Sequence, residues 1–173
     1  MNYSKSLALL APIFASMLSG VTAAETLQQV RLVAPLDEPE FYCLDLSGWG
    51  DHLKLDDPLQ AHTCKTRRAD DQLFAIKDGK ILVGETDRCL QVAVSSGKAL
   101  AGSALLARTC SDSAMQAFTL EEDGRISVTG SDLCVAAGDE STDASGPSHV
   151  WRVLSVERCD SVSAELMTWQ IGL

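Results

Sequence analysis

The six cysteines of this chain fall into three pairs with nearly equal spacing. The two members of a pair are 21, 21 and 25 residues apart, and the leading members of successive pairs are 46 and 45 residues apart. Six cysteines can pair in many ways, but this spacing is met most economically by one bridge within each of three similar units. We therefore predict the disulfides Cys43–Cys64, Cys89–Cys110 and Cys134–Cys159.

The sequence around these cysteines repeats as well. The stretch "DGKILVGETDRCL" beginning at Asp78 returns 45 residues later as "DGRISVTGSDLCV" beginning at Asp123. A fixed period of this length indicates a unit that cannot bury its own apolar face and packs against copies of itself. Phe74, Phe118 and Trp169 follow the second cysteine of their units by 10, 8 and 10 residues. Because an aromatic side chain buries a large apolar area, we expect these three to meet in a shared core.

The units are expected to consist of short β-strands. Apolar residues alternate with others just before the second cysteine of each unit, and this period of two is a strand signal. The pairs are Leu59 with Ala61, Leu105 with Ala107, and Leu154 with Val156. Asp-Gly dipeptides between apolar runs predict hairpins at residues 78–79 and 123–124. We predict an all-β fold of three repeats with pseudo-threefold symmetry, at about residues 30–77, 78–122 and 123–173.

The first 24 residues are typical of a signal peptide. Lys5 precedes an apolar run, and small residues at "SGVTAAE" suit a signal peptidase. The run is short for a membrane span, so an uncleaved anchor is the weaker interpretation. We therefore expect a single domain over residues 25–173, secreted, extracellular or periplasmic, in which the disulfides can persist.

The charge and the motifs exclude several classes of function. Without Lys5, 13 basic and 24 acidic side chains remain, a formal charge of −11. This charge disfavours nucleic acid and anionic membrane surfaces as partners. Metal-ligand spacings, glycine-rich phosphate loops and nucleophile motifs are missing from the sequence. We therefore expect neither catalysis nor a cofactor nor a metal.

The cysteine pairs and the aromatic motif together resemble one known family. "DQLFAI" and "MQAFTL" each contain Gln-x-aromatic after a cysteine pair, with Gln72 and Gln116 in the first position. This arrangement resembles the ricin-type β-trefoil lectins, whose motif is usually Gln-x-Trp. The resemblance covers roughly residues 30–173 and implies a β-trefoil. The third unit departs from it, with Met167 in place of the glutamine.

The resemblance also implies where a sugar would bind. Family sites use an aspartate two residues after the first cysteine, an aromatic two before the second, and an Asn-Gln pair. At these positions the first repeat has Asp45, His62 in place of a larger aromatic residue, Asp71 in place of the asparagine, and Gln72. Trp49 in "SGWGDH" could supply the missing flat surface. The second repeat has Gln91, Arg108 and Met115 at the first three positions, and the third has Ala136, Glu157 and Leu166. Asp45 and Asp71 could also be solvated acids, and Trp49 a loop anchor.

Two functions fit these residues. The first is a secreted carbohydrate-binding module for galactose-type glycans that uses one site in the first repeat. The second is a non-catalytic, protein-binding subunit of a secreted complex or toxin, in which the sugar sites have degenerated. The loss of the pattern in two of three repeats favours the second function, and its partial retention in the first repeat favours the first.

Overall fold

The computed structural model of the 173-residue chain describes residues 26–95, 97–146 and 149–172. The predicted signal peptide, residues 1–24, lies outside the described residues. The described part is built of short strands, and its helical residues form single 3₁₀ turns. The strands are β1 (Val30–Leu32), β2 (Tyr42–Asp45), β3 (Gln60–Thr63), β4 (Phe74–Lys77), β5 (Lys80–Val83), β6 (Arg88–Val92), β7 (Ser103–Thr109), β8 (Phe118–Leu120), β9 (Ile126–Val128), β10 (Leu133–Ala137), β11 (Thr142–Asp143), β12 (Val150–Arg158) and β13 (Trp169–Ile171). The 3₁₀ turns are η1 (Gly50–His52), η2 (Asp70–Gln72), η3 (Ala114–Gln116) and η4 (Ala164–Leu166). The all-β prediction is confirmed.

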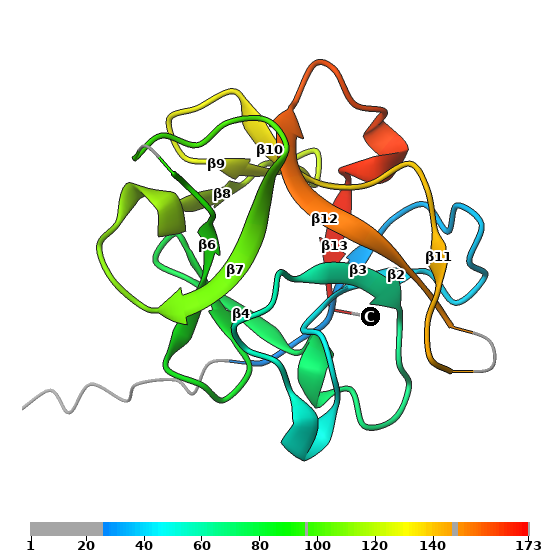
Figure 1. The fold of residues 1–173 in the computed structure, drawn as a ribbon. Coiled ribbons are helices and arrows are strands. Elements are labelled where there is room, and N and C mark those ends of the chain that lie inside the picture. Colours follow the sequence, from blue (N-terminus) through cyan, green and yellow to red (C-terminus); the bar gives the residue numbers. More distant parts are fainter. Residues whose placement is uncertain (1–25, 96, 147–148, 173) are drawn as a thin grey trace, which may run out of the picture.

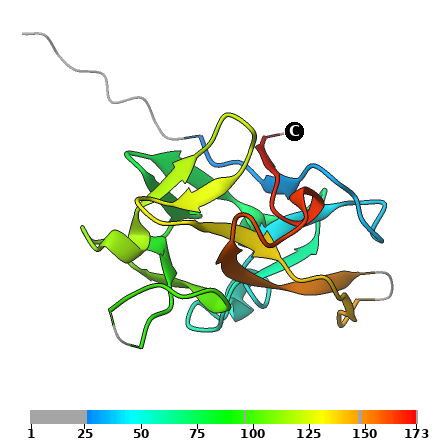
Figure 2. The ribbon, with the colours of Figure 1, turned by 90° about the horizontal axis from the view of Figure 1, so that it is seen from above.

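All the strands are joined by antiparallel pairing into one curled sheet. The main path runs β13-β1-β2-β3-β12-β7-β6-β5-β4, and β12 also pairs with β10 and β11, while β9 pairs with β8 and β10. Figure 1 shows three groups of strands around a common centre, led by β2–β3, β6–β7 and β10–β12. The two ends of the described chain lie on the same side (Figure 2), where β1 and β13 pair from Val30↔Ile171 to Leu32↔Trp169. This is the predicted β-trefoil.

The three recurring aromatic residues lie in the core, as predicted. Phe74, Phe118 and Trp169 are 1%, 4% and 2% exposed and belong to one hydrophobic cluster. The indole of Trp169 donates a hydrogen bond to the carbonyl oxygen of Val135 (2.9 Å), so its polar atom is satisfied inside the core. All six alternating strand residues, from Leu59 to Val156, are also buried.

The three predicted disulfides are present. Cys43–Cys64, Cys89–Cys110 and Cys134–Cys159 join Cα atoms 5.0, 4.9 and 5.1 Å apart. Each closes a loop within one repeat. On the chain-entropy account, a loop of this size stabilises the folded state by about 3 kcal/mol.

The two predicted hairpins differ in length. Asp78 and Gly79 form a two-residue loop between β4 and β5, with φ of 50° and 73°. Positive φ at both positions is what a tight hairpin of this kind requires, and aspartate and glycine tolerate it. The second hairpin, β8–β9, has a five-residue loop over 121–125, in which Gly124 has φ of 86°.

The third repeat carries an extra piece of sheet. Its longer distance between cysteines is taken up by β11 and by the first half of β12, which pair as Thr142↔Trp151 and Asp143↔Val150. The same half of β12 pairs with β3 of the first repeat through Trp151↔His62. The insertion therefore borders the first repeat. No helix in the described ranges is long and apolar enough to cross a membrane.

Candidate functional site

Three of the five predicted site residues come together at the end of β2. Asp45 is the last residue of β2, and Asp71 and Gln72 lie in η2, which follows β3. A backbone hydrogen bond from Leu46 N to Asp71 O (2.9 Å) holds the end of β2 against η2. Asp45, Asp71 and Gln72 are 0%, 1% and 0% exposed, so they are internal polar groups rather than solvated surface residues.

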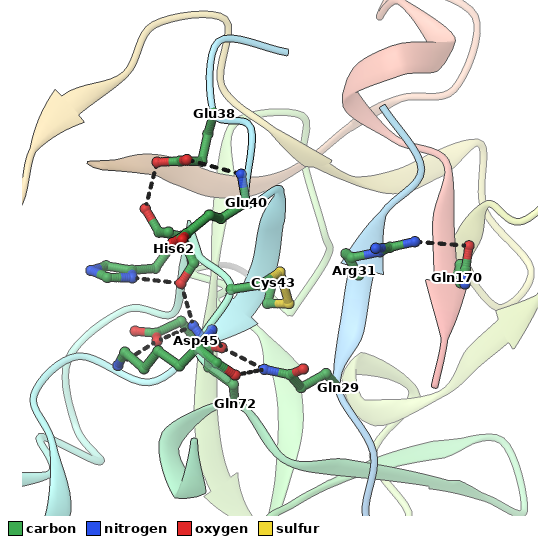
Figure 3. Close-up of a disulfide and its surroundings, with 12 residues drawn as sticks. Gln29, Arg31, Glu38, Glu40, Cys43, Asp45, His62, Gln72 and Gln170 are labelled. Carbon is green, nitrogen blue, oxygen red and sulfur yellow. Dashed lines mark hydrogen bonds and ion pairs between the residues drawn. A yellow bond between two sulfur atoms is a disulfide. The ribbon is translucent and has the colours of Figure 1, made fainter. Parts of the chain in front are cut away.

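The amide of Gln72 organises this cluster (Figure 3). Its Nε2 donates to Asp45 Oδ2 and to Thr63 O, both at 2.9 Å. Its Oε1 accepts from Gln29 Nε2 and from the backbone N–H of Lys65, both at 2.8 Å. Both donors and both lone pairs of the amide are therefore used within the protein. Gln72 fixes the orientation of Asp45 and has no hydrogen-bonding capacity left for a ligand.

Lys65 lies between the two buried carboxylates. Its ammonium group donates to Asp45 Oδ2 (3.2 Å) and to Asp71 Oδ2. Its side chain is 15% exposed, so it is the part of the cluster that solvent reaches. Gln60 completes the shell, because its Nε2 donates to Asp45 Oδ1 (2.8 Å). By contrast, Asp71 Oδ1 is buried and has no hydrogen-bond partner among the described residues.

Burial and ion pairing act in opposite directions on these groups. Burial raises the pKa of Asp45, and the attraction of Lys65 opposes this rise without cancelling it. For Lys65, burial lowers the pKa, but the charges of Asp45 and Asp71 outweigh burial and raise it. The pKa values of Asp45 and Lys65 are thus both raised. Asp45 is inaccessible and feels the full loss of hydration, whereas the partly exposed Lys65 keeps some hydration and stays charged.

The two predicted aromatic residues differ in how far solvent reaches them. His62, on β3, is 8% exposed; its Nδ1 donates to Thr63 O (3.0 Å), and its ring meets that of His149 edge-on at 5.5 Å. Trp49 lies in the loop between β2 and β3, where it is 65% exposed and its ring contacts His52 at 5.6 Å. His62 is therefore largely covered, whereas Trp49 presents most of its surface to solvent.

Sequence reasoning missed three members of the cluster: Gln29, Gln60 and Lys65. Gln60 could have been found from strand pairing, because Asp45↔Gln60 are opposite each other on β2 and β3, and opposite residues face the same side. Lys65 follows Cys64 directly, but nothing in the sequence indicates that its ammonium group pairs with Asp45 and Asp71. Gln29 precedes the first repeat and reaches Gln72 across 43 residues.

The corresponding positions in the second repeat form a neutral version of the same network. Gln116 Nε2 donates to Gln91 Oε1 (2.8 Å) and to Thr109 O (3.0 Å). Its Oε1 accepts from the backbone N–H of Ser111 (2.7 Å). The amide thus serves the fold in both repeats, and the second repeat has no carboxylate at the position of Asp45.

The third repeat has replaced the network with apolar contacts. Ala136 and Met167, at the positions of Asp45 and Gln72, are 0% and 6% exposed and cluster with Cys134. The buried carboxylates are therefore a feature of the first repeat. Within the described ranges, no group of three or more His, Cys, Asp or Glu residues could hold a metal ion.

Known proteins of the same architecture include sugar-binding ones. An agglutinin from Abrus precatorius superposes with a TM-score of 0.62 at 18% identity over 94% of this chain, which spans about half (51%) of the agglutinin chain. The C-terminal half of an earthworm R-type lectin, solved with GalNAc, gives 0.60 at 11% identity over 84% of this chain and 97% of its own. The β-trefoil lectin of a Vibrio vulnificus hemolysin, solved with N-acetyl-D-lactosamine, gives 0.56 at 17% identity over 87% and 96%. At these identities the likeness establishes the fold.

The sequence itself establishes the family. No curated protein matches the chain by sequence. The model of the ricin-type β-trefoil lectin domain, however, matches residues 37–163, which include all six cysteines and both buried carboxylates, Asp45 and Asp71. The chain therefore belongs to the ricin-type β-trefoil lectin domain family.

Proposed function

We propose that this protein is a secreted carbohydrate-binding module that takes one galactose-type glycan at the first repeat. The site would consist of Asp45, Asp71 and Lys65, oriented by Gln72, with His62 and Trp49 as flanking rings. The observation that carries the proposal is the pair of buried carboxylates around one partly exposed ammonium group. Sugar hydroxyls donate and accept hydrogen bonds, so they match a site that offers both kinds of partner.

The orphaned oxygen of Asp71 supports the same function. Leaving a buried acceptor unpaired costs about 1–3 kcal/mol, and more when the group is charged. Asp71 Oδ1 is covered in this structure, so a ligand hydroxyl would recover this cost only when side chains around Asp71 move on binding; Lys65, with three donors, can turn toward a ligand oxygen. The gain on binding therefore comes from groups that the fold itself leaves incompletely paired.

Two relatives bind ligands of this class. The earthworm lectin was solved with GalNAc and the Vibrio vulnificus lectin with N-acetyl-D-lactosamine, and both ligands contain a galactose-type ring. A single shallow site gives weak affinity, so physiological binding would depend on several copies acting together. This fits a module presented on an oligomer or on a larger secreted assembly.

Titration calorimetry with galactose and N-acetyllactosamine tests the proposal. Asp45→Asn should weaken binding at least tenfold, because a hydrogen bond to a charged group is worth about 1.5–3 kcal/mol. Gln91→Ala is the matched control, since Gln91 occupies the same position in the second repeat and should leave affinity unchanged. Equal affinities of the wild type and Asp45→Asn, at unchanged thermal stability, would count against the site.

A second candidate function is supported by the same ion cluster. Because Lys65 pairs with both carboxylates and the other two repeats lack them, the cluster could serve the fold alone in a subunit that binds protein. In that case neither the wild type nor Lys65→Ala would respond on a glycan array. The two candidates are thus separated by one array, read with both proteins.

A further inference from the structure

The insertion of the third repeat covers part of the first repeat's outer face. Through the pairs Trp151↔His62 and Val153↔Gln60, the first half of β12 lies directly beside β3. Residues opposite each other on antiparallel strands point to the same side of the sheet. Trp151 and Val153 therefore share a face with His62 and Gln60.

A ring contact confirms this placement. His149 precedes Trp151 by two residues, so it points to the same side of the chain, and its ring lies 5.5 Å from that of His62 at an interplanar angle of 86°. The contact is the diagonal neighbour of the Trp151↔His62 pair, as strand geometry requires. His62 is thereby largely covered, at 8% exposed, by residues of another repeat.

The same face of the sheet continues to the buried carboxylate of Asp45. Gln60 is opposite Val153 on one side and opposite Asp45 on the other, and its Nε2 donates to Asp45 Oδ1 (2.8 Å). Three neighbouring strands thus carry Asp45, Gln60 and Val153 in one row. A ligand held at the carboxylates that extends along this row meets β12 next.

What β12 presents there is apolar and accessible. Val153 is 58% exposed, and Trp151 is partly exposed. On the side away from β3, Val153 is next to Gly138, which directly follows β10, and the backbone N–H of Gly138 donates to Val153 O (2.8 Å). Gly138 has no side chain that could cover the valine. The apolar face of a sugar ring packs well against such a surface, and an aromatic ring with a polar edge suits a ligand that is partly hydrated.

We infer that Trp151 and Val153 form the contact surface for the second sugar residue of a bound glycan, so that two repeats together build the binding site. The inference rests on the proposed function and deepens it, because it names the substrate class as an oligosaccharide rather than a single galactose residue. The first residue would be held by the carboxylates of the first repeat, and the next would lie on the third repeat's insertion.

Affinities for galactose and N-acetyllactosamine, measured side by side, test this division. Trp151→Ala should weaken disaccharide binding about two- to tenfold, the value of one aromatic contact, and change galactose binding less than twofold. Trp151→Phe should restore most of the loss. Leu100→Ala is the control for an exposed apolar side chain, because Leu100 is 55% exposed, close to the 58% of Val153, but lies in the second repeat.

Val153→Asp provides a second variant that does not depend on the packing of the tryptophan. Val153 is mostly exposed, so its substitution should leave thermal stability unchanged and still weaken disaccharide binding selectively. The inference is overturned if Trp151→Ala and Val153→Asp affect both sugars equally or affect neither. If Asp45→Asn abolishes binding in the same experiment, only the extended surface fails; if no glycan binds the wild type, the proposed function fails with it.

Discussion

Replacing Lys65 tests how the buried carboxylates are held. Lys65→Met keeps a long aliphatic side chain of similar length and removes the ammonium group. The backbone N–H of residue 65 still donates to Gln72, so the amide network around the site is retained. What changes is the charge: Asp45 and Asp71 remain buried together without a cation.

The expected cost follows from the burial of the three groups. Removing one partner of a fully buried ion pair destabilises a protein by about 3–5 kcal/mol, because an uncompensated charge is left inside. Lys65 is 15% exposed and the two carboxylates are at most 1% exposed, so solvent screens only the lysine side of the interaction. We expect Lys65→Met to lower the free energy of unfolding by about 3 kcal/mol at pH 7.

The pH dependence of this loss identifies its cause. Burial already raises the pKa of Asp45, and the loss of Lys65 raises that pKa further. In the pH range between the unfolded value near 3.8 and the raised folded value, the folded state binds more protons than the unfolded state. Stability of the variant therefore falls as pH rises through this range. Urea unfolding at pH 4.5 and pH 7 should show the smaller deficit at the lower pH.

A compensating substitution separates charge from packing. In the double variant Lys65→Met with Asp45→Asn, one buried charge is gone. The asparagine oxygen can still accept from Gln72, and its amide nitrogen can donate to Gln60 once the Gln60 amide turns over. This variant should recover a substantial part of the lost stability, with a coupling energy above 0.5 kcal/mol. A deficit for Lys65→Met below 1 kcal/mol, or one that is the same at both pH values, would refute the electrostatic reasoning.

Two further predictions concern other parts of the fold. Hydrogen bonds from Ser141 and Arg152 lower the pKa of Asp37, so its stabilising effect is present above pH 3.8 and is lost as pH falls below that value; Asp37→Asn should flatten the acid limb of a stability-against-pH curve measured by circular dichroism. A methyl group added at Gly124, where φ is 86°, would lie 2.8 Å from a backbone oxygen of β13. Gly124→Ala should therefore cost more than 1 kcal/mol in urea unfolding, and clearly more than Gly130→Ala, where φ is 76° but the space is open.

Much of the fold could be predicted because its signals are local and recur three times. The distance between Cys43 and Cys64 sets one hairpin and one disulfide, and the same distance returns at Cys89 and Cys110. An interpretation that holds for one unit is thereby tested on the next. The buried position of Trp169 follows in the same way from its register with the two phenylalanines.

The candidate site could be predicted only in part, because it depends on contacts between distant segments. Asp45, Asp71 and Gln72 were placed by register within one repeat. Gln29 bonds to Gln72 across 43 residues, and Trp151 pairs with His62 across 89 residues. No period in the sequence indicates these two contacts. The insertion of the third repeat was visible in the sequence as a longer distance between Cys134 and Cys159. That it packs against the first repeat follows only from the pairing of β12 with β3 in the structure.

The three repeats also show how a site can change while the fold stays. In the first repeat, a buried carboxylate accepts from a buried amide. In the second repeat, a glutamine, Gln91, replaces the carboxylate and the amide keeps its partners. In the third, both partners are apolar, as Ala136 and Met167. Removing one partner of such a pair leaves the other unsatisfied, whereas replacing both costs little. Because the core aromatics are unaffected by these exchanges, each repeat can keep or lose its polar pair without disturbing the trefoil.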